Sequence, residues 1–346
     1  MHHTFASDNT AGVCPEALAA VQAANPGHAP SYGDDAWTVR ARDAISGVFE
    51  TECTVHFAFN GTMANALALS AACRSYQSVF CHEQAHIIVD ECGAPEHFTG
   101  GSKLIGLRGA GAKVTPAALD TAAHLGHGVH FHKAGAVSLT QSTELGTVYT
   151  PAEIAAIADV ARRHGMAVHL DGARFANAAA ALADRGATPA DFTWRAGVDL
   201  LSFGGTKNGM LTTEAVVIFN PALATDFAFR VKQFGQLASK SRFAGAQWVA
   251  MLEDGVWLRH ARHANTMARR LADGFSALPG CALSVPTEAN GVFVSLPPAV
   301  VTGLEQRGWK FYPFGDPGTY RFMCGWDTSP AAVAALLADA RAAAGH

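Results

Sequence analysis

This sequence of 346 residues has neither a strong excess of one charge sign nor a long apolar run. Only 16% of the residues are charged, the formal net charge is −4, and no basic block occurs, which argues against nucleic acid as the main partner. The apolar stretches are short and interrupted by Gly, Pro or polar residues, and the first ten residues, MHHTFASDNT, lack an apolar core. We therefore expect no transmembrane helix, no signal peptide and no membrane partner.

Cysteine is scarce as well, and its spacing forms no framework. The seven cysteines are an odd number, and no CxxC motif occurs among Cys14, Cys53, Cys73, Cys81, Cys92, Cys281 and Cys324. This pattern predicts reduced thiols and a cytoplasmic location. The 16 histidines do not combine with these cysteines at the spacing of a structural zinc site, so we expect no metal centre.

Apolar residues and glycine are abundant, at 49% hydrophobic residues and 34 glycines, which is enough for a large core. Short, continuous apolar runs alternate with helical patterns such as the one that TPAE (150–153) opens as a capping box and Gly165 ends. Continuous runs are typical of strands covered on both faces, and their alternation with helices predicts an α/β domain with a mostly parallel sheet flanked by helices. The predicted strands are 54–59, 78–81, 103–107, 136–141, 167–170, 199–203 and 215–219.

The character of the chain changes after Asn220. Residues 222 to about 278 have a helical pattern, and short strands then surround a helix near 300–307 before an alanine-rich helix over 329–344. We predict a large α/β domain over 1–245, and a helical connection with a small α+β domain over 246–346.

Two charged residues stand where predicted buried strands end. Asp171 closes the run in HLDGARF (169–175), and Lys207 follows the run in SFGGTKNGM (202–210). A buried charge is costly unless it is paired or used in function. Since ligands bind at the carboxyl ends of parallel strands, we expect the two side chains to meet in one crevice.

Pyridoxal phosphate chemistry needs this pair of residues. A lysine binds the cofactor's aldehyde, and an aspartate keeps the pyridine nitrogen protonated so that the ring accepts an electron pair. FNGTMANALAL (59–69) adds a strand end, a Gly61–Thr62 turn and a helix start, which together suit a phosphate. Each element alone has an ordinary structural explanation, such as a turn aspartate or a helix start, and GGTK lacks the spacing of a nucleoside-triphosphate loop. Their order predicts the cofactor.

Seven segments, which span nearly the whole chain, resemble the threonine aldolases of the β-eliminating-lyase family, which are pyridoxal-phosphate enzymes of fold type I. The resemblance is nearest to the low-specificity bacterial L-threonine aldolase branch. The segments are FASDNTAGVCPEAL (5–18), YGDDAWT (32–38), FNGTMANALAL (59–69), EQAHI (83–87), HLDGARF (169–175), FGGTKNG (203–209) and YRFMCGWDT (320–328).

The resemblance implies a role for each matching residue. It implies that Lys207 binds the cofactor covalently, that Asp171 contacts the ring nitrogen and that His86 stacks on the ring. It further implies that Arg321, with Arg174 and Ser7, holds the substrate carboxylate. Three groups of residues complete the implied site: Gly61 and Thr62 at the phosphate, Arg174 also near the cofactor, and Tyr32, Arg230 and Lys240 at a neighbouring subunit's site in a homotetramer.

One segment departs from the family. Better-known members have an ENTH-like segment whose histidine lies near the substrate hydroxyl, whereas this chain has TQSTELG (140–146), without histidine. The group that takes the hydroxyl proton is therefore open among His86, a bound water, His132 and Glu144.

The implied reaction is the cleavage of L-threonine, L-allo-threonine and related β-hydroxy-α-amino acids, such as phenylserine, to glycine and an aldehyde. Two alternatives stay open at this point. One is another pyridoxal-phosphate reaction on the same fold, β-elimination or transamination. The other is a binding protein without catalytic activity, which the presence of Lys207, Asp171 and Arg321 disfavours.

Overall fold

The computed structural model describes residues 4–126 and 128–345, and its centre is a seven-stranded sheet in the order β1-β7-β6-β5-β4-β2-β3. Each of the seven predicted strands is present, within three residues of its expected ends. The strands are β1 (Thr54–Ala58), β2 (Gln77–His82), β3 (Lys103–Leu107), β4 (Lys133–Thr140), β5 (Ala167–Gly172), β6 (Leu200–Gly204) and β7 (Glu214–Ile218).

The sheet is mostly parallel, as predicted. Strands β3, β2, β4, β5 and β6 pair in parallel, and β7 runs antiparallel to both of its neighbours. On β6, Leu200 faces one apolar cluster while Leu201 and Phe203 face another, so the sheet is covered on both faces. This double burial explains why the strands read as continuous apolar runs.

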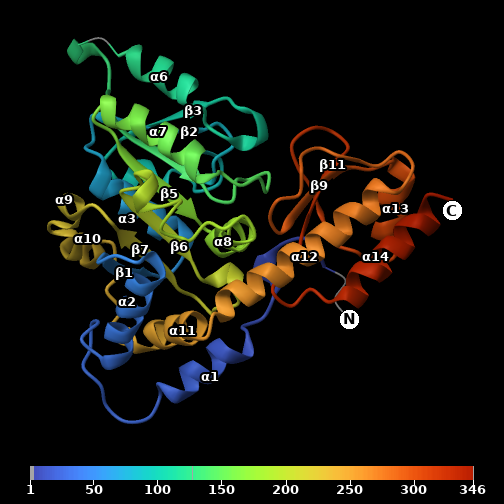
Figure 1. Ribbon diagram of the computed structural model, residues 1–346, viewed down its shortest axis with the longest axis horizontal. Coiled ribbons are helices and arrows are strands. Elements are labelled where there is room, and N and C mark those ends of the chain that lie inside the picture. Colours follow the sequence, from blue (N-terminus) through green and yellow to red (C-terminus); the bar gives the residue numbers. More distant parts are fainter. Residues whose placement is uncertain (1–3, 127, 346) are drawn as a thin grey trace.

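Helices cover both faces of the sheet (Figure 1). Their starts follow the sequence signals: Thr150 and Glu153 form the expected capping box, and Thr115 and Ser329 cap the helices that follow them. The helices before residue 220 are α1 (Pro15–Ala23), α2 (Ala36–Phe49), α3 (Gly61–Ala72), α4 (His86–Val89), α5 (Ala94–Phe98), α6 (Pro116–His124), α7 (Pro151–Arg163) and α8 (Phe175–Ala183).

The predicted helical stretch after Asn220 consists of α9 (Pro221–Ala224), α10 (Phe227–Gln233), α11 (Arg242–Glu253) and α12 (Val256–Ser276). A small antiparallel sheet then follows, in the order β10-β11-β9-β8. Figure 1 shows these C-terminal elements to one side of the large sheet, with α12 running between the two parts. The elements are β8 (Ala282–Leu283), β9 (Gly291–Ser295), α13 (Pro298–Gln306), β10 (Tyr312–Pro313), β11 (Thr319–Met323) and α14 (Pro330–Ala343).

Helix α12 belongs to two cores. Ala261, in its first half, packs in the large core beneath the seven-stranded sheet, whereas Met267, Leu271 and Phe275 pack in a second core with β9 and β11. The expected division of the chain into 1–245 and 246–346 stays a prediction.

The N-terminal segment joins the small sheet and then leads to the centre of the molecule. Thr4 forms a bridge with Lys310, and the Phe5 carbonyl accepts a hydrogen bond from the Met323 amide at 2.7 Å. Phe5 is buried in the second core, and Asp8 contacts Arg174 directly after β5, so residues 4–8 contact both parts of the molecule. Within residues 4–126 and 128–345, we find no helix with the length and apolar character needed to span a membrane.

Candidate active site

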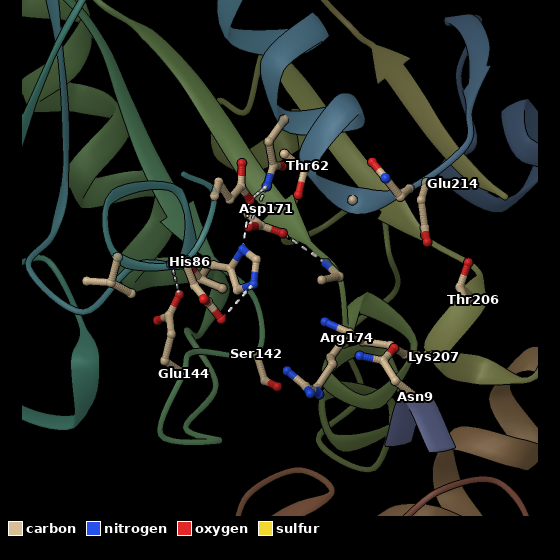
Figure 2. A pocket seen from close by; sticks show the side chains of 18 of the residues that line it. Asn9, Thr62, His86, Ser142, Glu144, Asp171, Arg174, Thr206, Lys207 and Glu214 are labelled. Carbon is tan, nitrogen blue, oxygen red and sulfur yellow. Dashed lines mark hydrogen bonds and ion pairs between the residues drawn. The ribbon is translucent and has the colours of Figure 1, made fainter. Parts of the chain in front are cut away.

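A cavity of about 360 Å³ lies at the carboxyl ends of the central strands, and it contains the strand-end charges singled out in the sequence. Figure 2 shows His86, Asp171, Arg174 and Lys207 arranged around it. The lining comes from both sheets, because Arg321 on β11 contributes to the same wall as residues of the large sheet. Asp171 and Lys207 therefore meet in one cavity, as the strand-end rule predicted.

Asp171 is buried at the end of β5, with 3% of its surface exposed. Its Oδ1 atom accepts a hydrogen bond from the Ala173 amide at 3.0 Å, and its Oδ2 atom accepts one from Asn65 Nδ2 at 2.9 Å. Hydrogen bonds from neutral donors stabilise a buried carboxylate without neutralising it. Asp171 can therefore act as a fixed anion for a cationic ligand nitrogen.

Lys207 follows β6 on a short 3₁₀ turn, Thr206–Asn208. Gly204 and Gly205 permit this turn, because a Cβ atom on Gly204 would lie 2.4 Å from the Ala173 carbonyl oxygen and one on Gly205 would lie 2.5 Å from the Thr213 carbonyl oxygen. Burial, reinforced by the nearby Arg174 cation, lowers the pKa of Lys207. A lowered pKa increases the neutral, nucleophilic fraction of an amine.

Glu214 is a second carboxyl group near this turn, and sequence patterns did not predict it as a site residue. It lines the cavity from β7, and its Oε2 atom accepts a hydrogen bond from the Gly205 amide at 2.6 Å. Burial raises the pKa of Glu214 to about 7. The contact holds the glycine turn that carries Lys207.

The predicted phosphate turn opens α3. Asn60 caps this helix by accepting a hydrogen bond from the Met63 amide at 2.9 Å, and Gly61 and Thr62 line the cavity. The first amides of a helix have no carbonyl partner within it, and the helix dipole favours an anion at this end. The hydroxyl groups of Thr206 and Thr212 also line the cavity.

His86 is held by a buried carboxylate that sequence reasoning missed. Its Nδ1 atom lies 2.8 Å from Glu91 Oε1, and Asn65 Nδ2 donates to the same oxygen at 2.9 Å. The hydrogen bond to Glu91 is the main cause of the raised pKa of His86. Asn65 thus connects the carboxylates of Glu91 and Asp171. Asn65 lies within the segment 59–69, and Glu91 follows the segment 83–87, both of which resemble the family. The hydrogen-bond partners of these two residues are evident only in the folded chain.

Arg174 lines the cavity, and part of its guanidinium group forms an ion pair with Asp8. Its Nε and Nη2 atoms contact the two carboxylate oxygens of Asp8 at 2.7 and 2.8 Å. Asn290 donates to Asp8 Oδ2 at 3.0 Å. Asp8 therefore fixes the position of Arg174 at the cavity wall, and the sequence did not predict this pairing.

Arg321 forms fewer polar contacts with the protein than Arg174 does. Its Nη2 atom donates to the Ala6 carbonyl oxygen at 3.3 Å, and its guanidinium carbon lies 5.4 Å from the centre of the Phe314 ring. Its buried Nε atom has no hydrogen-bond partner among the described residues. A planar guanidinium with free donors suits a carboxylate ligand.

The other sequence candidates lie away from this cavity. Ser7 lines a neighbouring cavity and accepts a hydrogen bond from the Asn9 amide at 3.1 Å, while Asn9 itself lines the main cavity. Tyr32 is 49% exposed, and its ring contacts the Lys232 ammonium group. Arg230 on α10 is half-buried, and Lys240 is exposed before α11. Their expected role at a neighbouring subunit stays a prediction.

Among the other candidate bases, Glu144 lines the main cavity, whereas His132 lines a separate cavity with Tyr76 and Phe80. Three further potential metal ligands, Asp120, His124 and His164, gather between α6 and α7. Asp120 Oδ1 already contacts His164 Nε2 at 2.9 Å and Arg163 Nη2 at 3.4 Å, as in an ordinary ion-pair cluster. The expected absence of a metal centre stays a prediction.

The chain combines a mostly parallel sheet with a lysine and an aspartate at strand ends and a helix that begins at the same cavity. This combination is typical of a class of cofactor-dependent lyases and transferases. The sequence profile of one such family, beta-eliminating lyase, matches residues 4–297. The chain belongs to this family.

Three known proteins are similar to it over nearly their whole length. The low specificity L-threonine aldolase of a Pseudomonas species is 53% identical, over 98% of this chain and 97% of the relative. The protein of that name from Pseudomonas aeruginosa is 52% identical, over 97% and 96%. The solved structure of Leishmania major threonine aldolase superimposes with a TM-score of 0.92 at 28% identity, over 99% of both chains. These matches confirm the predicted fold class.

Proposed function

We propose that the chain is a pyridoxal-phosphate-dependent lyase that cleaves L-threonine, L-allo-threonine and related β-hydroxy-α-amino acids to glycine and an aldehyde. The observation that carries this proposal is the convergence of Lys207, Asp171 and Arg321 on one cavity. The full-length similarity to two proteins named low specificity L-threonine aldolase supports the choice of reaction.

The residues present fit the cofactor. Lys207 offers an amine of lowered pKa for the aldehyde, and Asp171 offers a buried carboxylate for the pyridine nitrogen. Gly61 and Thr62 at the start of α3, with the hydroxyl groups of Thr206 and Thr212, would hold the phosphate. The donors and charges around the cavity thus correspond to the aldehyde, the ring nitrogen and the phosphate of this group.

When bound, pyridoxal phosphate supplies a ring that accepts the electron pair released at the α-carbon of the substrate. Asp171 holds a proton at the ring nitrogen, which keeps the ring electron-withdrawing. Arg321, with Arg174 beside it, binds the substrate carboxylate and orients the bond to be broken. We assign acceptance of the hydroxyl proton to His86, because Glu91 contacts its Nδ1 atom at 2.8 Å, whereas the Asp90 carboxylate lies 3.7 Å from Nε2, beyond hydrogen-bond distance, so Nε2 can still accept a proton.

The decisive experiment is a visible spectrum of the purified protein with pyridoxal phosphate, followed by addition of L-threonine. We expect a visible band from the bound cofactor and release of acetaldehyde and glycine in equal amounts. Ammonia with a keto acid would favour elimination, and transfer of the amino group would favour transamination. A protein that gains no band would exclude pyridoxal phosphate chemistry altogether.

We further propose a homotetramer and a cytoplasmic location. The exposed positions of Tyr32 and Lys240 support a role for these residues between subunits. All seven cysteines are free, which supports a reducing compartment. Size-exclusion chromatography with light scattering tests the tetramer, and a tyrosine-to-alanine change at residue 32 tests whether subunit contact and activity are lost together.

A further inference from the structure

Two carboxyl groups hold His86 from different directions. Glu91 contacts the imidazole ring, whereas Glu144 Oε1 accepts a hydrogen bond from the His86 backbone amide at 3.0 Å. His86 is the first residue of the short helix α4, where no helical carbonyl is available to this amide. Figure 2 shows Glu144 on the same side of the cavity as His86, with Arg174 and Lys207 on the other side.

The segment that carries Glu144 is fixed by its own hydrogen bonds. The Gln141 side chain binds both the amide and the carbonyl oxygen of Tyr149 at 2.9 Å. The hydroxyl groups of Thr143 and Thr147 lie 2.9 Å apart, and the Thr147 hydroxyl donates to the Gly111 carbonyl oxygen at 2.6 Å. A carboxyl group mounted on such a segment is a rigid support rather than a mobile surface charge.

The second carboxyl oxygen of Glu144 also indicates a functional role for this residue. Its Oε2 atom is buried and has no hydrogen-bond partner among the described residues, as is the case for the neighbouring Ser142 hydroxyl group. Both residues line the main cavity and a small adjoining recess that also contacts Arg174 and Arg321. An unpaired buried carboxyl oxygen is costly, which is expected where a residue serves function more than stability.

We propose that Glu144 is a positioning residue for the reaction. By accepting a hydrogen bond from the His86 backbone amide, it holds the imidazole of His86 at the cavity wall. This inference rests on the proposed function, and it assigns a task to the segment 140–146, in which this chain departs from the histidine-containing members of the family. Glu144 acts through His86 and does not need to touch the substrate.

The charge of Glu144 responds to pH in the neutral range. Burial raises the pKa of Glu144 to about 7, and the carboxylate of Asp171 contributes to this increase. The other charged or titratable groups that interact with Glu144 are Arg174, Tyr149 and Cys81. An ionised carboxylate is the stronger hydrogen-bond acceptor, so the hold on His86 should tighten as pH rises through about 7.

The test compares Glu144→Ala with Glu144→Gln, because glutamine keeps a carbonyl oxygen for the His86 amide and alanine does not. We expect Glu144→Ala to lower kcat for L-threonine by about tenfold or more, with a much smaller change in KM. The dissociation constant of pyridoxal phosphate should also rise, because His86 faces the cofactor. Glu144→Gln should restore most of kcat, and the change of kcat with pH near 7 should become smaller than in the wild type. Glu214, whose pKa also lies at about 7, and His86 account for the change that remains.

The control is Glu305→Gln. Glu305 is exposed on α13 and does not line the cavity, so this change should leave every readout unchanged. If Glu144→Ala does not fold, Glu144→Asp replaces it, because aspartate withdraws the carboxyl group by one methylene and should also lower kcat. Wild-type kcat and cofactor affinity in Glu144→Ala, or equal losses in Glu144→Ala and Glu144→Gln, would overturn the proposal. If the wild-type enzyme binds cofactor but releases no aldehyde, the proposed function fails, and cofactor affinity still tests Glu144.

Discussion

Asp8 and Arg174 stand 166 positions apart in the sequence and form a two-point ion pair beside the active-site cavity, at 2.7 and 2.8 Å. The Asp8 side chain is fully buried, and that of Arg174 is 18% exposed. Burial by itself would raise the pKa of Asp8, but Arg174, together with Lys207 and Asn290, outweighs it and the pKa falls to about 2. The pair therefore anchors the N-terminal segment to the end of β5.

This pair predicts a pH-dependent contribution to stability. The pKa of Asp8 is lower in the folded chain than the ordinary value of 3.8, so its contribution is present above that value and is lost as pH falls toward 2. We expect Asp8→Asn to reduce the free energy of unfolding by about 2 kcal/mol at pH 6, with a smaller difference near pH 2. Urea unfolding curves across this range provide the measurement, and a constant difference at every pH would contradict the assignment.

The Lys207→Ala variant tests the covalent anchor. Without the amine, we expect no visible band from bound cofactor and loss of aldolase activity, while far-ultraviolet circular dichroism stays that of the wild type. Lys103→Ala is a matched control, because Lys103 is exposed on β3 and lies outside the cavity. An unchanged visible spectrum in Lys207→Ala would show that another residue holds the cofactor.

The Arg321→Ala variant tests the carboxylate clamp. We expect KM for L-threonine to rise by about tenfold to a hundredfold, since a charge-assisted bond to the substrate is lost. Arg321→Lys should recover only part of this loss, because an ammonium group lacks the planar fork. Steady-state kinetics measures both variants, and an unaltered KM in Arg321→Ala would remove Arg321 from the substrate site.

The Asp171→Asn variant tests the ring-nitrogen contact. Asparagine keeps the size of the side chain and removes its charge, so we expect the fold and cofactor binding to persist while kcat falls by roughly a hundredfold. The measurements are the visible spectrum and kcat on one preparation. Asp191→Asn, at an exposed ion pair with Arg195, is the control for loss of a carboxylate elsewhere. Equal kcat for Asp171→Asn and wild type would refute the role of Asp171.

Local sequence pattern was enough to predict the large sheet and the meeting of Asp171 and Lys207 in one cavity. The strands are covered on both faces, so their apolar runs are continuous, and parallel strands bring their carboxyl ends to one edge. Asp171 and Lys207 could therefore be placed together from the sequence, and the family resemblance added His86 and Arg321 to the same cavity.

The supporting residues could not be predicted in this way. Asn65 contacts Asp171 across 106 positions, and Glu144 contacts His86 across 58. Such contacts depend on the packing of separate helices and loops, which leaves no periodic signal in the sequence. Ser7 shows the converse: it belongs to a recognised segment, yet its hydroxyl caps a local turn outside the main cavity.

Arg321 is carried by the small antiparallel sheet, whereas Lys207 and Asp171 are carried by the large one. In the proposed function, the contact of Arg321 with the substrate carboxylate would thus come from a different stretch of the chain than the contacts with the cofactor. Because every α-amino acid carries this carboxylate, Arg321 would hold amino acids in general, and the choice among their side chains would depend on other residues of the cavity.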